Sequence, residues 1–479
     1  MSRRSIIYRP GHDDRGIGAS LTARFAAIRD EFGIHPDFPA PVLEEASHAA
    51  EGAALPDRDE TAVPFITIDP ATSQDLDQAM FLERAGEGYR VRYAIADVPA
   101  FVRVGGAIDE EARRRGQTVY CPDLRVQLHP TELSEGAASL LPDQVRPAFV
   151  WDIELATDAT TTGVRVYRAM VRSVRRYDYT EVQAAVDDGK ADECLMLLKE
   201  IGEKRVLLER ERGGASLPMP EQEVTEDDDG GFEVSFRPLV DAEDWNAQIS
   251  LLSGMGAAEM MLAGQIGILR TMPPPDPRSL QRFRRQAAAA GVPWPHDMRY
   301  GEFLRTLDRT NPRQLALIHE ATALFRGAAY TPFDGAPPEQ PLHAAVASPY
   351  AHVTAPLRRL VDRFGLVICE ALSSGVEVPD WVRDALPGLP AIMATSDKVA
   401  NGVARACTDA VEAAELLAFV GQRLQAVVVD ANDKSVTVQL TEIGVVAKAS
   451  GTARPGESVH VRVDTAEIAM GKVSLSVVA

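Results

Sequence analysis

Ile68-Asp69-Pro70-Ala71-Thr72-Ser73-Gln74-Asp75-Leu76-Asp77-Gln78 is an acidic stretch that places three carboxylates within nine residues. It follows the apolar run 63–68, whose β-forming residues predict a strand. Carboxylates held this close repel one another, and a divalent cation would relieve the repulsion. A calcium loop of the EF-hand type is excluded, because Gln74 stands where that loop needs glycine and Met80 where it needs glutamate. A metal-binding loop and a solvated loop that caps a helix remain as alternatives.

A second stretch, residues 351–359 (A-H-V-T-A-P-L-R-R), predicts the start of a helix. Thr354 is a good N-cap, and a proline two residues later suits the first turn. The apolar face of this helix, predicted over about 356–373, consists of Leu357, Leu360, Val361, Phe364, Val367 and Ile368. Arg358 and Arg359 would lie in the first turn, where the helix dipole disfavours cations by a few tenths of a kcal/mol. A bound phosphate would account for them, and a salt bridge to an acidic loop is the alternative.

The rest of the chain predicts an α+β protein. Helices are expected at about 20–33, 42–50, 244–270 and 314–327, and further strands at 80–83 and 89–95. The short β-runs 424–429, 435–440 and 458–463 suit a five-stranded barrel of the OB type, with an extra sheet of the main domain as the alternative. We therefore predict a small helical N-terminal module over 1–60, a catalytic domain over 61–420 and a β-barrel over 421–479.

Composition sets the broad class of the protein. The 479 residues are 45% hydrophobic and 25% charged, as expected for a globular chain of several domains. Neither a signal peptide nor an apolar run long enough for a membrane span is found, so we expect a cytoplasmic protein with no membrane partner. The four cysteines lie far apart and predict neither a disulfide framework nor a zinc site.

The net charge of −20 argues mildly against a nucleic-acid partner, because phosphate-binding surfaces are usually basic. Charge is unevenly spread, however. Four arginines, Arg278, Arg282, Arg284 and Arg285, cluster within eight residues. A basic internal channel with an acidic exterior would reconcile the two observations, and a solvated helix face is the plainer alternative.

The acidic stretch and the arginine pair together resemble the RNase II/RNase R family, which is defined by its RNB domain. The family motif I-D-x5-D-x-D-D is matched by Asp69, Asp75 and Asp77, with Gln78 at the fourth aspartate. The motif T-S-P-I-R-R-Y-x-D is matched by Thr354, Pro356, Arg358, Arg359 and Asp362. Further family-like segments occur in the expected order at 94–98, 109–116, 120–123, 133–135, 139–140, 146–147 and 177–179. The resemblance covers about 35–420, and the final sixty residues are similar to the S1-like OB-fold domain.

This resemblance implies a 3′→5′ exoribonuclease that hydrolyses single-stranded RNA processively to 5′-mononucleotides. Asp69, Asp75 and Asp77 would hold Mg²⁺, which Mn²⁺ could replace. Arg358 would neutralise the scissile phosphate.

Four further residues, with Gln78, are predicted substrate contacts by the same resemblance: Tyr120, Tyr179, Arg359 and Thr354. Taken singly, each of these tyrosines would more often be a core or surface residue. We expect a monomer. The alternative function is an RNA-binding protein that keeps the RNB fold but is catalytically impaired, because Gln78 carries no charge.

Overall fold

The protein is described here by a computed structural model. It describes residues 6–9, 16–215, 217, 221–226, 232–237, 239–308, 311–441 and 445–478. Two closed five-stranded barrels, joined by helices, dominate this part of the chain, so the predicted α+β class is confirmed. In the described residues no helix is long and apolar enough to cross a membrane, and all four cysteines are free.

The central barrel has the strand order β2-β3-β4-β7-β8 and is antiparallel except where β2 pairs with β8. Its strands are β2 (Phe65–Ile68), β3 (Gln78–Ala85), β4 (Gly88–Ala96), β7 (Val145–Leu155) and β8 (Thr161–Tyr177). The predicted strands at 63–68, 80–83 and 89–95 are confirmed. Gly86, with φ 59°, adopts the left-handed conformation that the short β3–β4 turn requires. Closure leaves no exposed sheet edge beside the acidic stretch.

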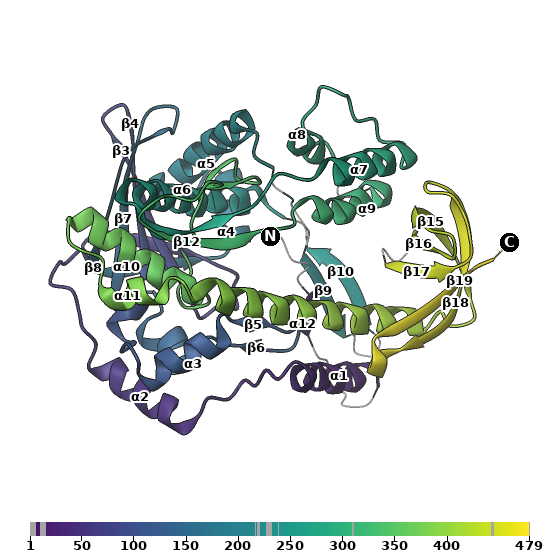
Figure 1. Cartoon of the computed structure of the whole chain (residues 1–479), viewed down its shortest axis with the longest axis horizontal. Helices are drawn as coiled ribbons and strands as arrows, with labels where there is room; N and C mark the ends of the chain where they lie inside the picture. Colours follow the sequence, from purple (N-terminus) through teal and green to yellow (C-terminus); the bar gives the residue numbers. More distant parts are fainter. Residues whose placement is uncertain are drawn as a thin grey trace.

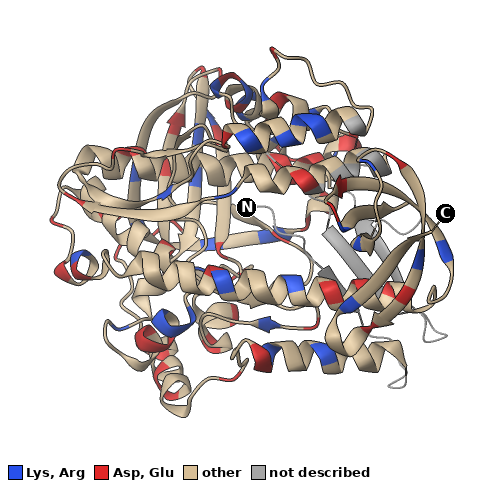
Figure 2. Cartoon of the chain, turned by 45° about the vertical axis from the view of Figure 1, so that its right-hand side comes forward, with Lys and Arg blue, Asp and Glu red and all other residues tan. Residues whose placement is uncertain are grey.

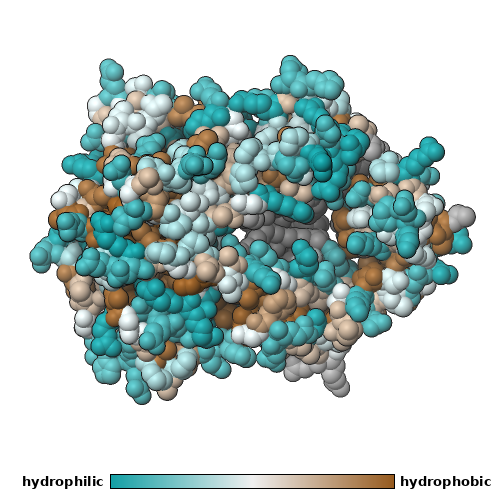
Figure 3. All heavy atoms as spheres, viewed as in Figure 1, coloured by the Kyte–Doolittle hydropathy of each residue, from teal (hydrophilic) through white to brown (hydrophobic). Residues whose placement is uncertain are grey.

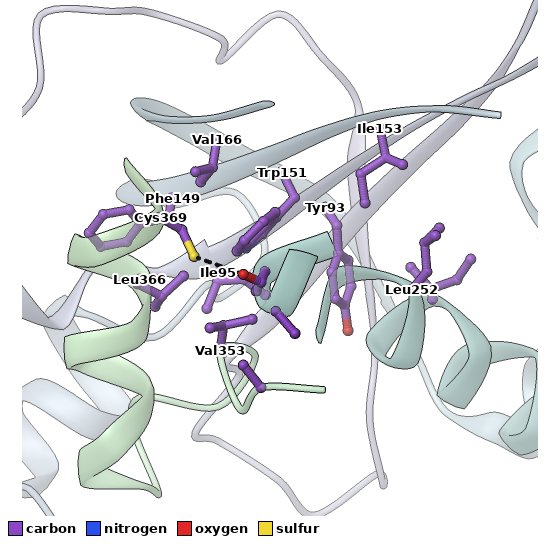
Figure 4. Close-up of a cluster of buried hydrophobic side chains, with 14 of the residues drawn as sticks. Tyr93, Ile95, Phe149, Trp151, Ile153, Val166, Leu252, Val353, Leu366 and Cys369 are labelled. Atoms are coloured by element: carbon purple, nitrogen blue, oxygen red, sulfur yellow. Dashed lines mark hydrogen bonds between the residues drawn. The ribbon is translucent and has the colours of Figure 1, made fainter. Parts of the chain in front are cut away.

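Helices α6 (Asp241–Gly264) and α10 (Leu360–Ser374) cover this barrel. Figure 4 shows Tyr93 and Trp151 of the barrel strands lying near Leu252 of α6 and near Leu366 and Cys369 of α10. The Cys369 thiol donates a weak hydrogen bond to the Ala257 carbonyl at 3.8 Å. This core fixes α10, and with it residues 351–359 just before that helix, against the barrel.

The predicted helix 244–270 is wrong at its C-terminal end. Gln265 takes the left-handed conformation (φ 56°) that ends α6. The next residues form strand β11 (Ile266–Thr271), which pairs with β12 (Ala329–Asp334). A short buried apolar run has the same composition in a helix or a strand, so periodicity could not separate them. The predicted helix 314–327 also ends early, because α9 stops at Ala321 and only a turn of 3-10 helix, Thr322–Leu324, follows.

The two predicted N-terminal helices are present as α1 (Ile17–Glu31) and α2 (Ala40–Glu51). Helix α1 packs on α12 (Leu389–Leu417), where Leu21, Phe25 and Ile28 meet apolar residues of the long helix. Helix α2 packs instead on α3 (Ala107–Arg115), beside the central barrel. The two helices therefore lie against different parts of the molecule (Figure 1).

The C-terminal residues form the predicted five-stranded barrel, with the order β15-β16-β17-β19-β18. Its strands are β15 (Arg423–Ala431), β16 (Ser435–Leu440), β17 (Val446–Ser450), β18 (Ser458–Glu467) and β19 (Lys472–Val478). Leu416, at the end of α12, belongs to the core of this barrel. Figure 3 shows a hollow in the surface between the barrel and the main body of the molecule.

The remaining elements connect these units. The helices are α4 (Tyr179–Asp187), α5 (Glu193–Arg212), α7 (Pro277–Ala289), α8 (Tyr300–Arg305), α9 (Pro312–Ala321) and α11 (Asp380–Ala385). The strands are β1 (Ile6–Arg9), β5 (Val119–Tyr120), β6 (Arg125–Val126), β9 (Glu221–Glu226), β10 (Phe232–Arg237), β13 (Leu342–His343) and β14 (Ser348–Pro349).

Candidate active site

The acidic loop, residues 69–77, connects β2 to β3 and is pinned at several points. The Asp69 N–H donates to the Tyr177 carbonyl at 3.1 Å. The Ser139 hydroxyl accepts from the Leu76 N–H at 2.9 Å and donates to the Gln74 carbonyl at 2.6 Å. These bonds fix the loop against the barrel, so its carboxylates have defined positions.

The arginine segment, residues 351–359, does not begin the helix as predicted. Helix α10 starts at Leu360, and its N-cap position is Arg359 rather than Thr354, with no side-chain capping bond. The reason is backbone pairing with a neighbouring segment: the Thr118 N–H donates to the Arg358 carbonyl at 3.0 Å, and the Leu360 N–H donates to the Gly116 carbonyl at 3.0 Å. Arg358 therefore lies in a turn and Arg359 in extended backbone, both before the helix. The dipole argument for a phosphate at a helical first turn does not apply to them.

The acidic loop and the arginine segment meet although roughly 280 residues separate them in the chain. One Asp77 oxygen, Oδ1, accepts from the Leu357 N–H at 2.8 Å, and Oδ2 lies 3.3 Å from Arg358 Nε. The Gln78 side-chain amide donates to the Thr354 carbonyl at 2.5 Å. Thr354 is 4% exposed and meets Gln78, the first residue of β3, through its backbone carbonyl. The structure thus brings four of the predicted site residues together.

Burial dominates the electrostatics of two of the aspartates. It raises the pKa of Asp69 to about 7, against the opposing effect of Arg358. It raises the pKa of Asp77 to about 8, although Arg358 and the Leu357 N–H both favour the carboxylate. The charge of Asp75 raises both values further. Asp69 Oδ2 is buried and has no hydrogen-bond partner. Asp69, Asp75 and Asp77, here called the acidic site, are crowded together, and such crowding favours a positive ligand.

Asp75 is held by a residue that the sequence reasoning missed. Arg125, on β6, donates to Asp75 Oδ1 at 2.5 Å and to Glu135 at 3.2 Å. The Gln127 amide also donates to Glu135, at 2.5 Å. The sequence feature that could have pointed to Arg125 is its position, two residues after the family-like segment 120–123.

The two predicted tyrosines flank the carboxylates. Tyr120 ends β5, is 47% exposed and interacts electrostatically with Arg358 and Asp75. Tyr179 begins α4, and its hydroxyl accepts from the Asn246 amide at 3.2 Å. Burial raises the pKa of Tyr179 to about 12, with a further contribution from the nearby charge of Asp69. Both rings therefore lie at the acidic site.

Arg359 turns away from the carboxylates of the acidic loop. Its guanidinium pairs with Asp362 at 2.8 Å, and the same carboxylate accepts from the Ala355 N–H at 2.7 Å. Arg359 also lines a cavity of about 430 Å³, together with Arg270, His343, Tyr350 and His352. The arginine pair is thus divided between two adjoining sites: Arg358 faces the acidic loop and Arg359 faces the cavity.

The donor set fits a hard divalent cation in its chemistry. Carboxylate oxygens are the ligands that such ions prefer, and the buried free oxygen of Asp69 points to a missing positive partner. Asp75 and Asp77 are engaged by Arg125 and Arg358 instead. Within the described ranges, no three carboxylate, histidine or cysteine side chains converge as a metal cluster. Both aspartates would therefore have to exchange a guanidinium contact for the cation.

Comparison with known families identifies the class of protein. A model of the RNB domain matches residues 57–370, and a model of the RNase II-type exonuclease C-terminal S1 domain matches residues 422–478. The chain therefore belongs to the RNB-domain family, and its C-terminal barrel is an S1 domain. The resemblance inferred from the sequence is confirmed.

Individual relatives agree with this assignment. Ribonuclease R of Escherichia coli is 29% identical over 343 residues, which cover 67% of this chain and 41% of that protein. The chain thus spans less than half the length of this relative. RNase R of Mycoplasma genitalium, in its apo form, has the same fold, with a TM-score of 0.84 at 18% identity over 96% of this chain and 78% of that one. Yeast Ssd1, described as a pseudonuclease, has a TM-score of 0.67 at 14% identity over 90% of this chain and 56% of that one.

Proposed function

We propose that this protein is a divalent-metal-dependent 3′→5′ exoribonuclease that hydrolyses single-stranded RNA processively to 5′-mononucleotides. One observation carries the proposal: an RNB domain in which Asp77 and Arg358 meet across the fold, beside a buried Asp69 oxygen without a partner. The carboxylates of such a pair suit a cation as ligand, and the guanidinium suits a phosphate.

Each residue has a distinct task in this proposal. Mg²⁺, held by Asp69, Asp75 and Asp77, would supply an activated water and charge neutralisation at the phosphate. Arg358, whose side chain is 43% exposed, would place its guanidinium on the scissile phosphate when RNA enters. This contact strengthens as negative charge accumulates in the transition state, so it accelerates hydrolysis rather than only binding RNA.

The terminal nucleotides would lie against the flanking tyrosines and the adjoining cavity. Tyr120 offers an exposed ring on which a base can stack, a contact worth about 1–3 kcal/mol per base. The cavity has room for a nucleotide-sized group, and Arg270 and Arg359 lie in its wall. Their guanidiniums are held in place by Asp397 at 3.4 Å and by Asp362 at 2.8 Å.

A second candidate function is RNA binding without hydrolysis. It is favoured by one observation at the site: Gln78, which carries no charge, donates to the Thr354 carbonyl. The fold shared with the pseudonuclease Ssd1 is compatible with either function.

The direction of hydrolysis tests the proposal against this alternative. The same single-stranded RNA is labelled at its 5′ end in one sample and at its 3′ end in another, and both are incubated with the protein and Mg²⁺. We expect the 3′ label to leave at once as a mononucleotide while the 5′ label shortens progressively. Bound but intact RNA in both samples would support the second candidate and contradict the first.

A further inference from the structure

Helix α7 has an apolar face and a basic face. Phe283 and Ala287 are buried against the surrounding helices. The opposite face carries three arginines, Arg278, Arg282 and Arg285, here called the arginine stripe, and all three are exposed. Their spacing of four and three residues puts them on one side of the helix, over a rise of roughly 10 Å.

Within the described residues, no ion pair accounts for the arginine stripe. None of its members forms an ion pair with a carboxylate in the described part of the chain. Asp276, the N-cap of α7, acts on Arg278 electrostatically, but its oxygens accept from the N–H groups of residues 278 and 279 and from the Ser279 hydroxyl. Arg284 differs, because its guanidinium lies 3.9 Å from the Trp294 ring centre and donates to nearby carbonyls. A protein of net charge −20 that leaves three neighbouring cations exposed favours an anionic ligand there.

The position of α7 suggests which anion the arginine stripe binds. Its backbone approaches both strand β15 of the S1 barrel and the turn Thr322–Leu324. That turn and Phe325 contribute to the wall of the cavity that Arg359 also lines. Helix α7 therefore contacts both the S1 barrel and an element of the cavity wall. Figure 2 shows basic residues along it.

We propose that the arginine stripe is a track for the phosphate backbone of single-stranded RNA that passes from the S1 barrel towards the acidic site. Exposed arginines bind phosphates without reading sequence, so this contact would add affinity for long RNA of any sequence. The barrel itself has no aromatic residue after Phe419 and balanced charge, so it needs such a neighbour to hold RNA. The inference rests on the proposed function for its direction, but the binding it describes does not require hydrolysis.

The test is the salt dependence of RNA affinity. Fluorescence anisotropy in EDTA, where RNA stays intact, gives the Kd for RNAs longer than the roughly 16 nucleotides that one OB fold can cover. For single strands the slope of log affinity against log salt is about −0.7 per phosphate contact, so replacing the three stripe residues with alanine should reduce its magnitude by about 2. The ratio of wild-type to variant affinity should then change by roughly 16-fold between 50 and 200 mM salt.

Two controls isolate the effect. Lysine at the same three positions keeps the charge and should keep the wild-type slope. The exposed residues Arg172, Lys190 and Arg210 lie elsewhere, and their replacement by alanine removes the same charge and should also leave the slope unchanged. Unaltered thermal unfolding would show that each variant folds.

The outcomes separate the two proposals. A wild-type slope in the alanine variant overturns the track even if the protein hydrolyses RNA. A reduced slope in a protein that never hydrolyses RNA supports the track and contradicts the exonuclease. If the alanine variant loses affinity for polyglutamate but not for RNA, the stripe binds acidic polypeptides and the track is overturned.

Discussion

Replacing Gln78 with glutamate tests how the start of β3, directly after the acidic loop, is joined to the arginine segment. The amide of Gln78 donates to the carbonyl of Thr354, which is only 4% exposed. A carboxylate cannot donate, so the substitution leaves that carbonyl without a partner and adds a negative charge beside Asp77. Losing the partner of a buried polar group costs about 1–3 kcal/mol. Each kcal/mol corresponds to about 2–4 °C in Tm for a domain of about 150–250 residues.

Thermal unfolding in EDTA, followed by circular dichroism, measures this loss. Gln422→Glu is the matched control, because the Gln422 amide also donates to a backbone carbonyl, that of Ala418 at 3.0 Å, but at an exposed site. We expect the control to change stability by less than about 0.5 kcal/mol. The assigned contact between Gln78 and Thr354 is refuted if Gln78→Glu unfolds at the wild-type temperature and also needs less Mg²⁺ for half-maximal hydrolysis. That pair of results would mean that position 78 faces the cation and not Thr354.

Three further predictions concern the same site. Arg358→Ala should lower turnover by about 10²-fold and affect RNA affinity far less; equal losses in steady-state kinetics and in binding would make Arg358 a general RNA tether. Tyr120→Ala should weaken RNA binding by about 1–3 kcal/mol while Tyr120→Phe should not, and equal affinities of the two variants in a binding titration would remove the stacking role. In EDTA, the free energy of unfolding of Asp69→Asn should rise relative to that of the wild type as pH rises from about 4 to about 7, by up to about 4 kcal/mol. The folded protein keeps the Asp69 proton up to its raised pKa of about 7, whereas the unfolded chain releases it near 3.8, so ionisation costs the wild type stability in that window. A Tm difference that is constant over this pH range would contradict the burial of Asp69.

Local sequence patterns predicted the elements that depend on nearby residues. Runs of β-forming residues bounded by turn residues identified the strands around the acidic loop, and the same signals identified the C-terminal barrel. Apolar spacing identified helices α1 and α2. These features depend on contacts between residues that are close in the chain, so the sequence pattern predicts them directly.

Features that depend on residues far apart in the sequence could not be predicted from local patterns. The N-cap of α10 is Arg359 and not the predicted Thr354, because residues 116–118 pair with the backbone there. The division of tasks between the two arginines depends on Asp362, which captures Arg359. Arg125 reaches Asp75 across fifty residues of sequence. No local signal in one sequence distinguishes these contacts from others of the same chemistry.

Asp77, which contacts Arg358, is proposed to hold, together with Asp69 and Asp75, the Mg²⁺ on which RNA hydrolysis depends. The most direct measurement follows 5′-labelled single-stranded RNA with the wild type and with Asp77→Asn, each in Mg²⁺ and in EDTA. Asparagine keeps an oxygen for the Leu357 N–H but removes the charge. We predict progressive shortening only for the wild type in Mg²⁺, with turnover of Asp77→Asn lower by at least about 10²-fold and RNA affinity preserved. Equal turnover of both proteins in Mg²⁺, or shortening that persists in EDTA, would contradict this assignment.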